Sequence, residues 1–310
     1  MSILRLKPAY LNDIWGGSRL KKEYNKSDYP GYVLSETWEL SCDEEHPTII
    51  DSGSYKGKTL KEYLDNEGAK VLGTNYERFS EWPLSVKLID AHQNISIKVH
   101  PSIEYAEKNG LPKGNDECWY ILDALPNAGI FYGVDRDVTQ EEFTKMVRNN
   151  TFKEVLHFQP VQKGELYYCG PGLLHSIGAG VVVAEVKQLN QVKYRVYDFG
   201  RVRPDGNPRE LMINEAKEAA ILKKDIPAKD MHGHLCDCDT FTIDKVRVDG
   251  EKTLSTDGST FQHMLVVKGD MILTSGDTRM EILQGNGFFI SADHGEYRLK
   301  GHGEVLLISV

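Results

Sequence analysis

Short apolar runs separated by turns rich in glycine, aspartate and asparagine are the feature that most constrains the fold of this chain. They occur at residues 86–100, 180–185, 241–248, 262–267, 287–290 and 304–310. Many short strands joined by turns are typical of antiparallel sandwiches and barrels. The sequence therefore predicts a mainly β protein.

Helices are predicted at only a few places. Thr59 is followed three residues later by Glu62, and Thr139 is followed in the same way by Glu142. A threonine with a glutamate at this spacing favours a capped helix start. The apolar residues after Thr139 fall partly at helical spacing, and the alanine-rich residues 214–222 also favour a helix.

Size and charge limit the possible functions. The chain has 310 residues, enough for one large β domain or two smaller ones. Its net charge of −9 would repel a phosphate backbone, so no nucleic-acid partner is expected. No signal peptide or membrane-length apolar run is evident, so no membrane is expected. Five cysteines, an odd number, favour reduced thiols in the cytoplasm.

Residues 224–238 contain the best candidate for a domain boundary. Lysine, aspartate, proline, histidine and cysteine interrupt a helical segment there, before the last group of strands. We predict an N-terminal domain over residues 1–235, with helical insertions, and a C-terminal domain over residues 236–310. The spacing of His100, Glu117 and His175 in the first domain is not repeated in the second domain, which is therefore predicted to have a structural role.

Two histidines and one carboxylate form a candidate metal site. His100 ends an apolar strand, Glu117 lies one loop further on, and His175 follows the turn at residues 170–172. Such a trio suits a divalent metal that keeps an open coordination position. The alternative is that the two histidines are separately hydrogen-bonded in the core or in loops, and the spacing alone leaves both interpretations open.

Gly164, Gly170 and Gly172, with their spacing to His175, resemble the second signature of cupins. Longer segments resemble type I phosphomannose isomerase (mannose-6-phosphate isomerase) in its short bacterial form. These segments are residues 15–20, 36–41, 98–101, 117–122, 175–178 and 194–199. The resemblance implies a bicupin, which consists of two jelly-roll β-barrels with a few helices. It also implies one zinc ion in the N-terminal cupin.

The activity implied by this resemblance is an aldose–ketose isomerisation of a small sugar phosphate. The family interconverts mannose 6-phosphate and fructose 6-phosphate through an enediol. His100, Glu117 and His175 match three of its four zinc ligands. Arg195 matches an arginine that contacts substrate or assists proton transfer, and Glu185 matches a carboxylate of the same cavity.

Three positions of the expected site depart from the family pattern. Lys98 stands where the fourth zinc ligand is usually glutamine. Asn115 replaces a lysine, and Gln191 replaces an aspartate. These changes favour an alternative function, in which a diverged bicupin binds a sugar or sugar phosphate without isomerising it, or acts on a different sugar.

Lys98 is the most consequential of these departures. A unit charge 4 Å from a divalent ion is repelled by about 8 kcal/mol at an effective dielectric of 20. Lys98 is therefore neutral, or turned away from a site completed by water, or paired with Glu117 or Glu185 in a metal-free site. We expect the second arrangement, with the ammonium in the space left at Asn115 and against a substrate oxygen or phosphate. Lys113 is a rival for that role.

Three tryptophans and two cysteines have simpler interpretations. Trp15, Trp38 and Trp119 are predicted to be core aromatics or to line a sugar pocket, with Trp119 packing close to the metal site. Cys118 and Cys169 are predicted to be small buried residues rather than nucleophiles.

Overall fold

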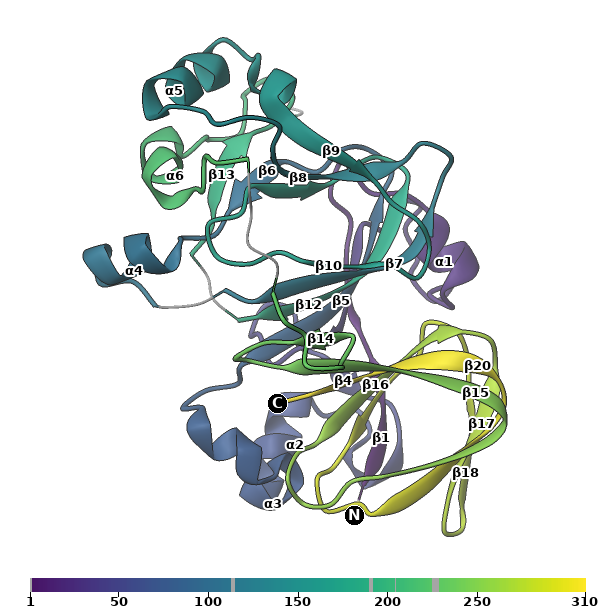
Figure 1. The fold of residues 1–310 in the computed structure, drawn as a ribbon. Coiled ribbons are helices and arrows are strands. Elements are labelled where there is room, and N and C mark those ends of the chain that lie inside the picture. The colour runs from purple at the N-terminus through teal and green to yellow at the C-terminus, as the bar shows by residue number, and fades with distance from the viewer. Residues whose placement is uncertain (1, 113–114, 190–191, 204, 225–228) are drawn as a thin grey trace. The chain divides into compact units, whose positions relative to one another are not determined.

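The computed structural model describes residues 2–112, 115–189, 192–203, 205–224 and 229–310 (Figure 1). Lys113 and Gln191, named above as members of the expected site, lie outside these ranges. The fold is mainly β, as predicted, because short strands and turns dominate the described chain. Within the described ranges, no helix is both long and apolar enough to cross a bilayer.

The described chain forms two compact units. The first consists of residues 1–90, 184–186 and 230–310, and the second of residues 91–183 and 187–229. Strand β12 (Val181–Gln188) contributes residues to both. The first ninety residues thus group with the C-terminal strands, so the predicted domains 1–235 and 236–310 do not coincide with the compact units and stay a prediction.

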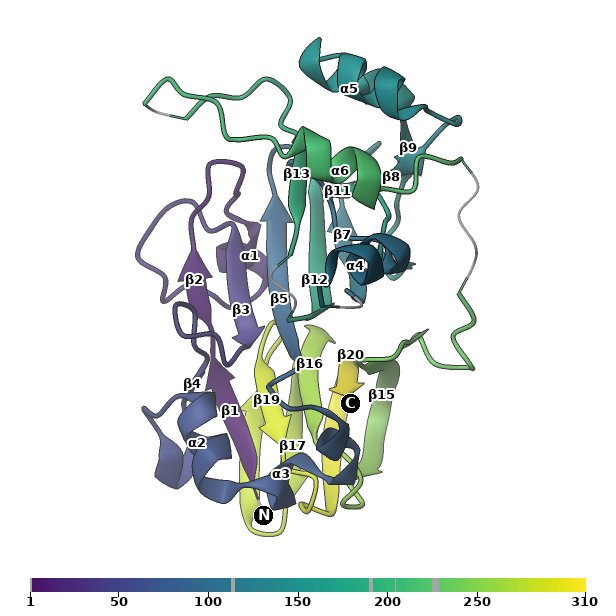
Figure 2. The ribbon, with the colours of Figure 1, turned by 90° about the vertical axis from the view of Figure 1, so that its left-hand side faces the viewer.

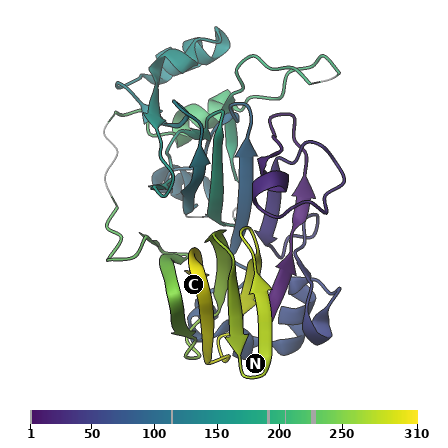
Figure 3. The same cartoon turned by 90° about the vertical axis from the view of Figure 1, so that its right-hand side faces the viewer.

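The first unit contains a nine-stranded sheet in the order β14-β15-β20-β16-β19-β1-β4, with β17 pairing β18 and β20. Figure 3 shows its long C-terminal strands in green to yellow. The strands are β1 (Ile3–Lys7), β4 (Ile49–Ile50), β14 (Cys236–Asp237), β15 (Thr242–Ser255), β16 (Gln262–Lys268), β17 (Met271–Ser275), β18 (Thr278–Ile282), β19 (Gly287–Ile290) and β20 (Glu296–Ser309). Strands β16 and β19 bury nearly every residue and contribute to the core of this unit.

The first unit also holds three strands that pair in the order β2-β3-β5, and three short helices. The strands are β2 (Ala9–Leu11), β3 (Glu36–Leu40) and β5 (Leu84–Ala91), and the helices are α1 (Arg19–Glu23), α2 (Leu60–Glu67) and α3 (Ala69–Leu72). The predicted cap of α2 is confirmed: Thr59 accepts from the Glu62 backbone N–H, and the Glu62 carboxylate accepts from the Thr59 N–H.

The second unit contains a five-stranded sheet in the order β13-β6-β11-β8-β9 and a pair of strands, β7 and β10. These strands are β6 (Ile97–Val99), β7 (Glu117–Ala124), β8 (Gly129–Val134), β9 (Leu156–Pro160), β10 (Leu166–Tyr168), β11 (His175–Ile177) and β13 (Tyr194–Tyr197). Figure 2 shows α6 (Ile213–Ala219) beside β13, and α4 (Ile103–Asn109) and α5 (Gln140–Arg148) also pack against α6.

Two predicted elements differ in detail from the structure. The run at residues 86–100 forms two strands, because residues 92–96 interrupt β5 and β6. The helix that begins after Thr139 ends at Arg148, and Phe152–Val155 forms a separate 3₁₀ turn. Both Phe143 of α5 and Phe152 of the turn are buried in the core of the second unit, so their apolar pattern reflects packing rather than one continuous helix.

Candidate metal centre

Cross-strand pairing brings three of the predicted site residues into one row. On the five-stranded sheet, Lys98 of β6 lies opposite His175 of β11 on one side and Arg195 of β13 on the other. Residues directly opposite each other in an antiparallel pair project from the same face of the sheet. The neighbours Ile97 and Val99 are fully buried in the core. Lys98 therefore lies on the same face as His175, and Ile97 and Val99 lie on the core face.

His100, Glu117 and His175 come together as a buried group. The Glu117 Oε2 atom lies 3.3 Å from His100 Nε2 and 3.9 Å from His175 Nε2. The two imidazole rings stack with centroids 5.5 Å apart and an interplanar angle of 21°. Their ligand atoms all lie within 4.8 Å of one another, so these three residues could hold a metal ion.

The backbone fixes which nitrogen of each histidine faces the group. His100 Nδ1 lies 2.9 Å from the Val192 carbonyl oxygen, and His175 Nδ1 lies 2.8 Å from the Leu173 carbonyl oxygen. A carbonyl only accepts, so each Nδ1 carries the proton and donates. Both Nε2 lone pairs are then directed toward Glu117, which is the tautomer that a metal requires.

Trp119 orients the carboxylate. Its indole Nε1–H donates to Glu117 Oε1 at 2.8 Å, and its ring meets the edge of His175 with centroids 5.4 Å apart. Because β7 carries both residues two positions apart, the strand places them on the same face. The predicted packing of Trp119 near the site is thus confirmed, and Glu117 Oε2 is left to face the imidazoles.

Burial and nearby charge keep these groups in the protonation states of metal ligands. Burial, with the charge of Lys187, lowers the pKa of His100 to about 3. Burial also lowers the pKa of His175. For Glu117, burial alone would raise the pKa, but Lys187 and the imidazoles together hold it well below its usual range. Neutral imidazoles beside an ionised carboxylate are the forms that bind a cation.

Lys187 is the member of this group that the sequence did not reveal. Its Nζ atom lies 2.9 Å from His100 Nε2 and 3.4 Å from Glu117 Oε2. The apolar run at residues 180–185 extends as β12 to Gln188, so strand alternation would place Lys187 on the same face as Glu185. A predicted strand extended from residue 185 to residue 187 would have included Lys187.

The remaining predicted residues lie in different surroundings. Arg195 Nη1 donates to the Glu210 carbonyl oxygen at 3.2 Å. Glu185 belongs to the first unit, where Lys87 Nζ lies 3.6 Å from its carboxylate. Lys98 is close enough to His175 for its charge to lower the pKa of that imidazole.

Asn115 has an unusual environment for a polar residue. Its side chain is fully buried, and neither its amide oxygen nor its amide nitrogen has a hydrogen-bond partner among the described residues. A buried amide without partners costs about 1–3 kcal/mol. The cost is recovered when a bound molecule supplies the partners, so Asn115 is a candidate for ligand contact.

Trp15, Cys118 and Cys169 are buried, as the core interpretation predicts. Trp38 is only partly buried; it stacks on His46 and lies beneath Lys87, whose Nζ is 3.8 Å from the ring centroid. None of the five cysteines, all of which lie in the described ranges, forms a disulfide.

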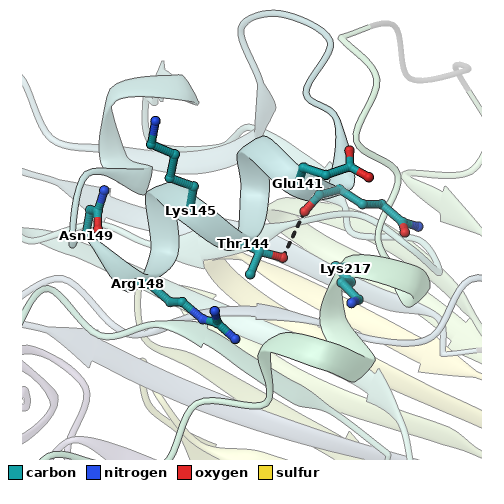
Figure 4. A pocket seen from close by; sticks show the side chains of 7 residues that line it. Glu141, Thr144, Lys145, Arg148, Asn149 and Lys217 are labelled. Carbon is teal, nitrogen blue, oxygen red and sulfur yellow. Dashed lines mark hydrogen bonds between the residues drawn. The ribbon is translucent and has the colours of Figure 1, made fainter.

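A separate cavity of about 500 Å³ lies between α5 and α6. Figure 4 shows Lys145, Arg148 and Lys217 around it, with Thr144 bonded to the Gln140 backbone. Its lining contains one carboxylate and no histidine among the described residues. It therefore lacks both the ligands for a metal and a paired acid and base, and we place the candidate chemistry at the His100 group.

Comparisons with known proteins agree with this geometry. Residues 3–152 match the family profile described as phosphomannose isomerase type I, catalytic domain. Residues 231–310 match the profile described as mannose-6-phosphate isomerase, cupin domain. The chain is 30% identical to mannose-6-phosphate isomerase ManA of Bacillus subtilis, over 98% of each chain. It is 34% identical to a mannose-6-phosphate isomerase of Streptococcus mutans, over 68% of this chain and 65% of the relative.

Solved structures are similar over the whole length. The mannose 6-phosphate isomerase of Bacillus subtilis superposes with a TM-score of 0.88 at 29% identity and covers all of both chains. The enzyme of Salmonella typhimurium, in its apo form, has a TM-score of 0.77 at 14% identity over 99% of each chain, which shows a shared fold. By length, identity and fold together, this chain belongs to the type I phosphomannose isomerase family and has its cupin fold.

Proposed function

We propose that this protein is a metal-dependent aldose–ketose isomerase that interconverts mannose 6-phosphate and fructose 6-phosphate. The observation that carries the proposal is the convergence of two Nε2 lone pairs on one buried carboxylate oxygen, within a chain of this family. Each histidine is already held in the ligand tautomer by a backbone carbonyl. The substrate is accordingly a small sugar phosphate.

The three residues fit zinc. Ligands about 2.0–2.1 Å from a tetrahedral zinc are themselves about 3.3 Å apart. The 3.3 Å between His100 Nε2 and Glu117 Oε2 matches this, and the 3.9 Å to His175 Nε2 requires only a small side-chain adjustment. Nitrogen and carboxylate donors with an open fourth position are the set that catalytic zinc prefers. We therefore assign one zinc ion per chain to His100, Glu117 and His175.

The bound metal supplies Lewis-acid polarisation of a sugar oxygen. The chain supplies the remaining chemistry. We propose that Arg195 and Lys98, which lie opposite each other on β13 and β6, stabilise the negative charge that develops on an enediol. On the family resemblance alone, we propose Glu185 as the group that carries the proton between C1 and C2.

A coupled assay tests this function. Fructose 6-phosphate formation from mannose 6-phosphate is measured with the native chain, after treatment with a chelator, and after zinc is restored. We expect turnover that the chelator abolishes and zinc recovers. Turnover that persists in a metal-free protein would contradict the metal assignment, and absence of turnover in a zinc-loaded protein would contradict the reaction.

A diverged sugar-binding bicupin is the second candidate, and Asn115 is the observation that favours it. Its amide is uncharged at a position where the family resemblance implies a lysine. A buried amide recognises a sugar hydroxyl better than a phosphate, because it offers one donor group and one acceptor of comparable strength. Binding of mannose in preference to mannose 6-phosphate by calorimetry, without turnover, would support this function.

We propose the cytoplasm as the location of the protein. The five cysteines, none of which forms a disulfide, agree with a reducing compartment. Sugar phosphates are charged and do not cross a membrane unaided, so they stay in the compartment where they are made.

A further inference from the structure

Lys187 contacts two of the candidate metal-binding atoms, one on His100 and one on Glu117. Its ammonium lies 2.9 Å from His100 Nε2 and 3.4 Å from Glu117 Oε2. We infer that Lys187 is an internal cation that competes with a divalent metal for these ligands and thereby sets the metal affinity of the chain. The inference deepens the proposed function and rests on the metal site assigned there.

The competition follows from the lone pairs. His100 Nδ1 donates to the Val192 carbonyl, so the only lone pair of the neutral ring is on Nε2. An ammonium only donates hydrogen bonds, so an N–H of Lys187 donates to that lone pair. A single lone pair cannot accept a hydrogen bond and coordinate a metal at once. Lys187 and a metal therefore exclude each other at His100.

Glu117 adds an electrostatic reason. Its Oε2 atom is the oxygen that faces both imidazoles, and it is also the oxygen in the ion pair with Lys187. Its side chain is only 3% exposed, so water does little to screen the charges around it. The lysine neutralises the carboxylate when no metal is bound, and its positive charge opposes an arriving cation.

The Lys187 side chain can leave the group without unfolding the strand. It is 15% exposed, compared with 3% for Glu117, so one side of it already reaches solvent. Its four-carbon stem rotates freely, whereas β12 holds only its backbone. Metal binding thus requires the ammonium to swing away, and the free energy of breaking its two contacts is subtracted from the binding free energy of the metal.

The test is a zinc titration of the metal-stripped full-length chain against a chromophoric chelator. Native protein is compared with Lys187→Met, Lys187→Gln and a control, Lys163→Met, which removes an exposed lysine of the same unit. We expect both Lys187 variants to bind zinc at least about tenfold more tightly, the scale found for partners of metal ligands. The Lys163→Met protein is expected to match the native chain.

Thermal melting supplies a second readout. Without metal, Lys187→Met is expected to melt below the native protein, because Glu117 loses its counter-ion. With saturating zinc this difference is expected to vanish or reverse. A Lys187→Met protein that folds but binds zinc no more tightly than the native chain overturns the inference, and weaker binding would show that Lys187 is itself a ligand.

These results separate this inference from the proposed function. If the native chain does not isomerise mannose 6-phosphate but Lys187→Met still gains zinc affinity, the reaction is wrong and the competition stands. If the native chain shows chelator-sensitive turnover and Lys187→Met gains no affinity, only the competition fails.

Discussion

Each compact unit contains a cluster of glutamate, lysine and histidine, but the two clusters are built differently. In the second unit, Glu117 Oε2 faces two imidazole nitrogens and Lys187. In the first unit, Lys26 Nζ lies 2.7 Å from Glu39 Oε1 and donates to the Gly285 carbonyl at 2.7 Å. In the Glu117 cluster, two imidazole nitrogens and one ammonium surround a single carboxylate oxygen, whereas in the Glu39 cluster one ammonium pairs with one carboxylate.

The cluster around Glu39 is closed by its neighbours. Thr37 Oγ1 donates to Glu39 Oε1 at 2.6 Å, so that oxygen already has two partners. Gly287 packs so closely that a Cβ added there would lie 3.1 Å from the His263 ring and 3.5 Å from Glu39 Oε2. The comparison teaches that residue types do not define a metal site. A metal site needs several ligand atoms close together, and among the described residues only those of His100, Glu117 and His175 form such a group, within 4.8 Å of one another.

The largest expected effect is the loss of a ligand charge. Glu117→Gln removes the anionic oxygen that faces both histidines, so zinc per chain should fall to background and isomerase turnover by more than about a thousandfold. Zinc content by mass spectrometry and the coupled assay measure both. Glu39→Gln is the matched control and should retain full zinc content. Retention of zinc by the Glu117→Gln protein would break the comparison.

The second prediction concerns stability. Lys26→Met leaves the fully buried Glu39 without its counter-ion, which should lower the free energy of unfolding by about 3–5 kcal/mol. Denaturant unfolding, monitored by circular dichroism, measures this loss, and zinc content should be unchanged in the folded fraction. A change below about 1 kcal/mol would show that the pair does not hold the first unit together.

The third prediction concerns pH. Burial, with Lys26 nearby, lowers the pKa of His263 from 6.5 to about 3. Between these values the unfolded chain binds a proton that the folded chain does not. Stability contributed by neutral His263 is therefore complete at high pH and falls by up to about 1.4 kcal/mol per pH unit as the pH drops.

His263→Gln removes this titration. Unfolding free energies of the native chain and the variant are compared at about pH 6 and pH 4, since other buried histidines add the same slope to both proteins. We expect the variant to lose less stability over this interval. Equal slopes would mean that the His263 ring takes up a proton in the folded state.

The smallest expected effect comes from removing the hydrogen bond that orients the Glu117 carboxylate. Trp119→Phe keeps the ring but removes the N–H that donates to Glu117 Oε1. Zinc affinity should fall about tenfold, and stability by about 1 kcal/mol. The zinc titration described for Lys187 measures the first, and thermal melting the second. An unchanged affinity would show that the strand alone orients Glu117.

Local patterns were enough to predict several parts of this molecule. The capped start at Thr59 depends on residues three positions apart, and it is present in the structure. The grouping of His100, Glu117 and His175 was predicted from spacing and resemblance, and the structure brings their ligand atoms together.

Long-range packing was not predictable in the same way. Strand β1 pairs with β19, so residues 3–6 lie against residues 287–290, and no local pattern links these segments. Lys187 contacts His100 Nε2 from 87 residues further along the chain, and no local pattern links these two residues either.

The sequence by itself determined the β character, the helix caps and the candidate ligand residues, because these depend on strand patterning, capping and side-chain chemistry. Only the tertiary structure decided which amine faces the ligands and which oxygen they share. Those outcomes depend on how β7, β11 and β12 place side chains from distant parts of the chain within about 3–4 Å of one another, the distance at which hydrogen bonds and ion pairs form.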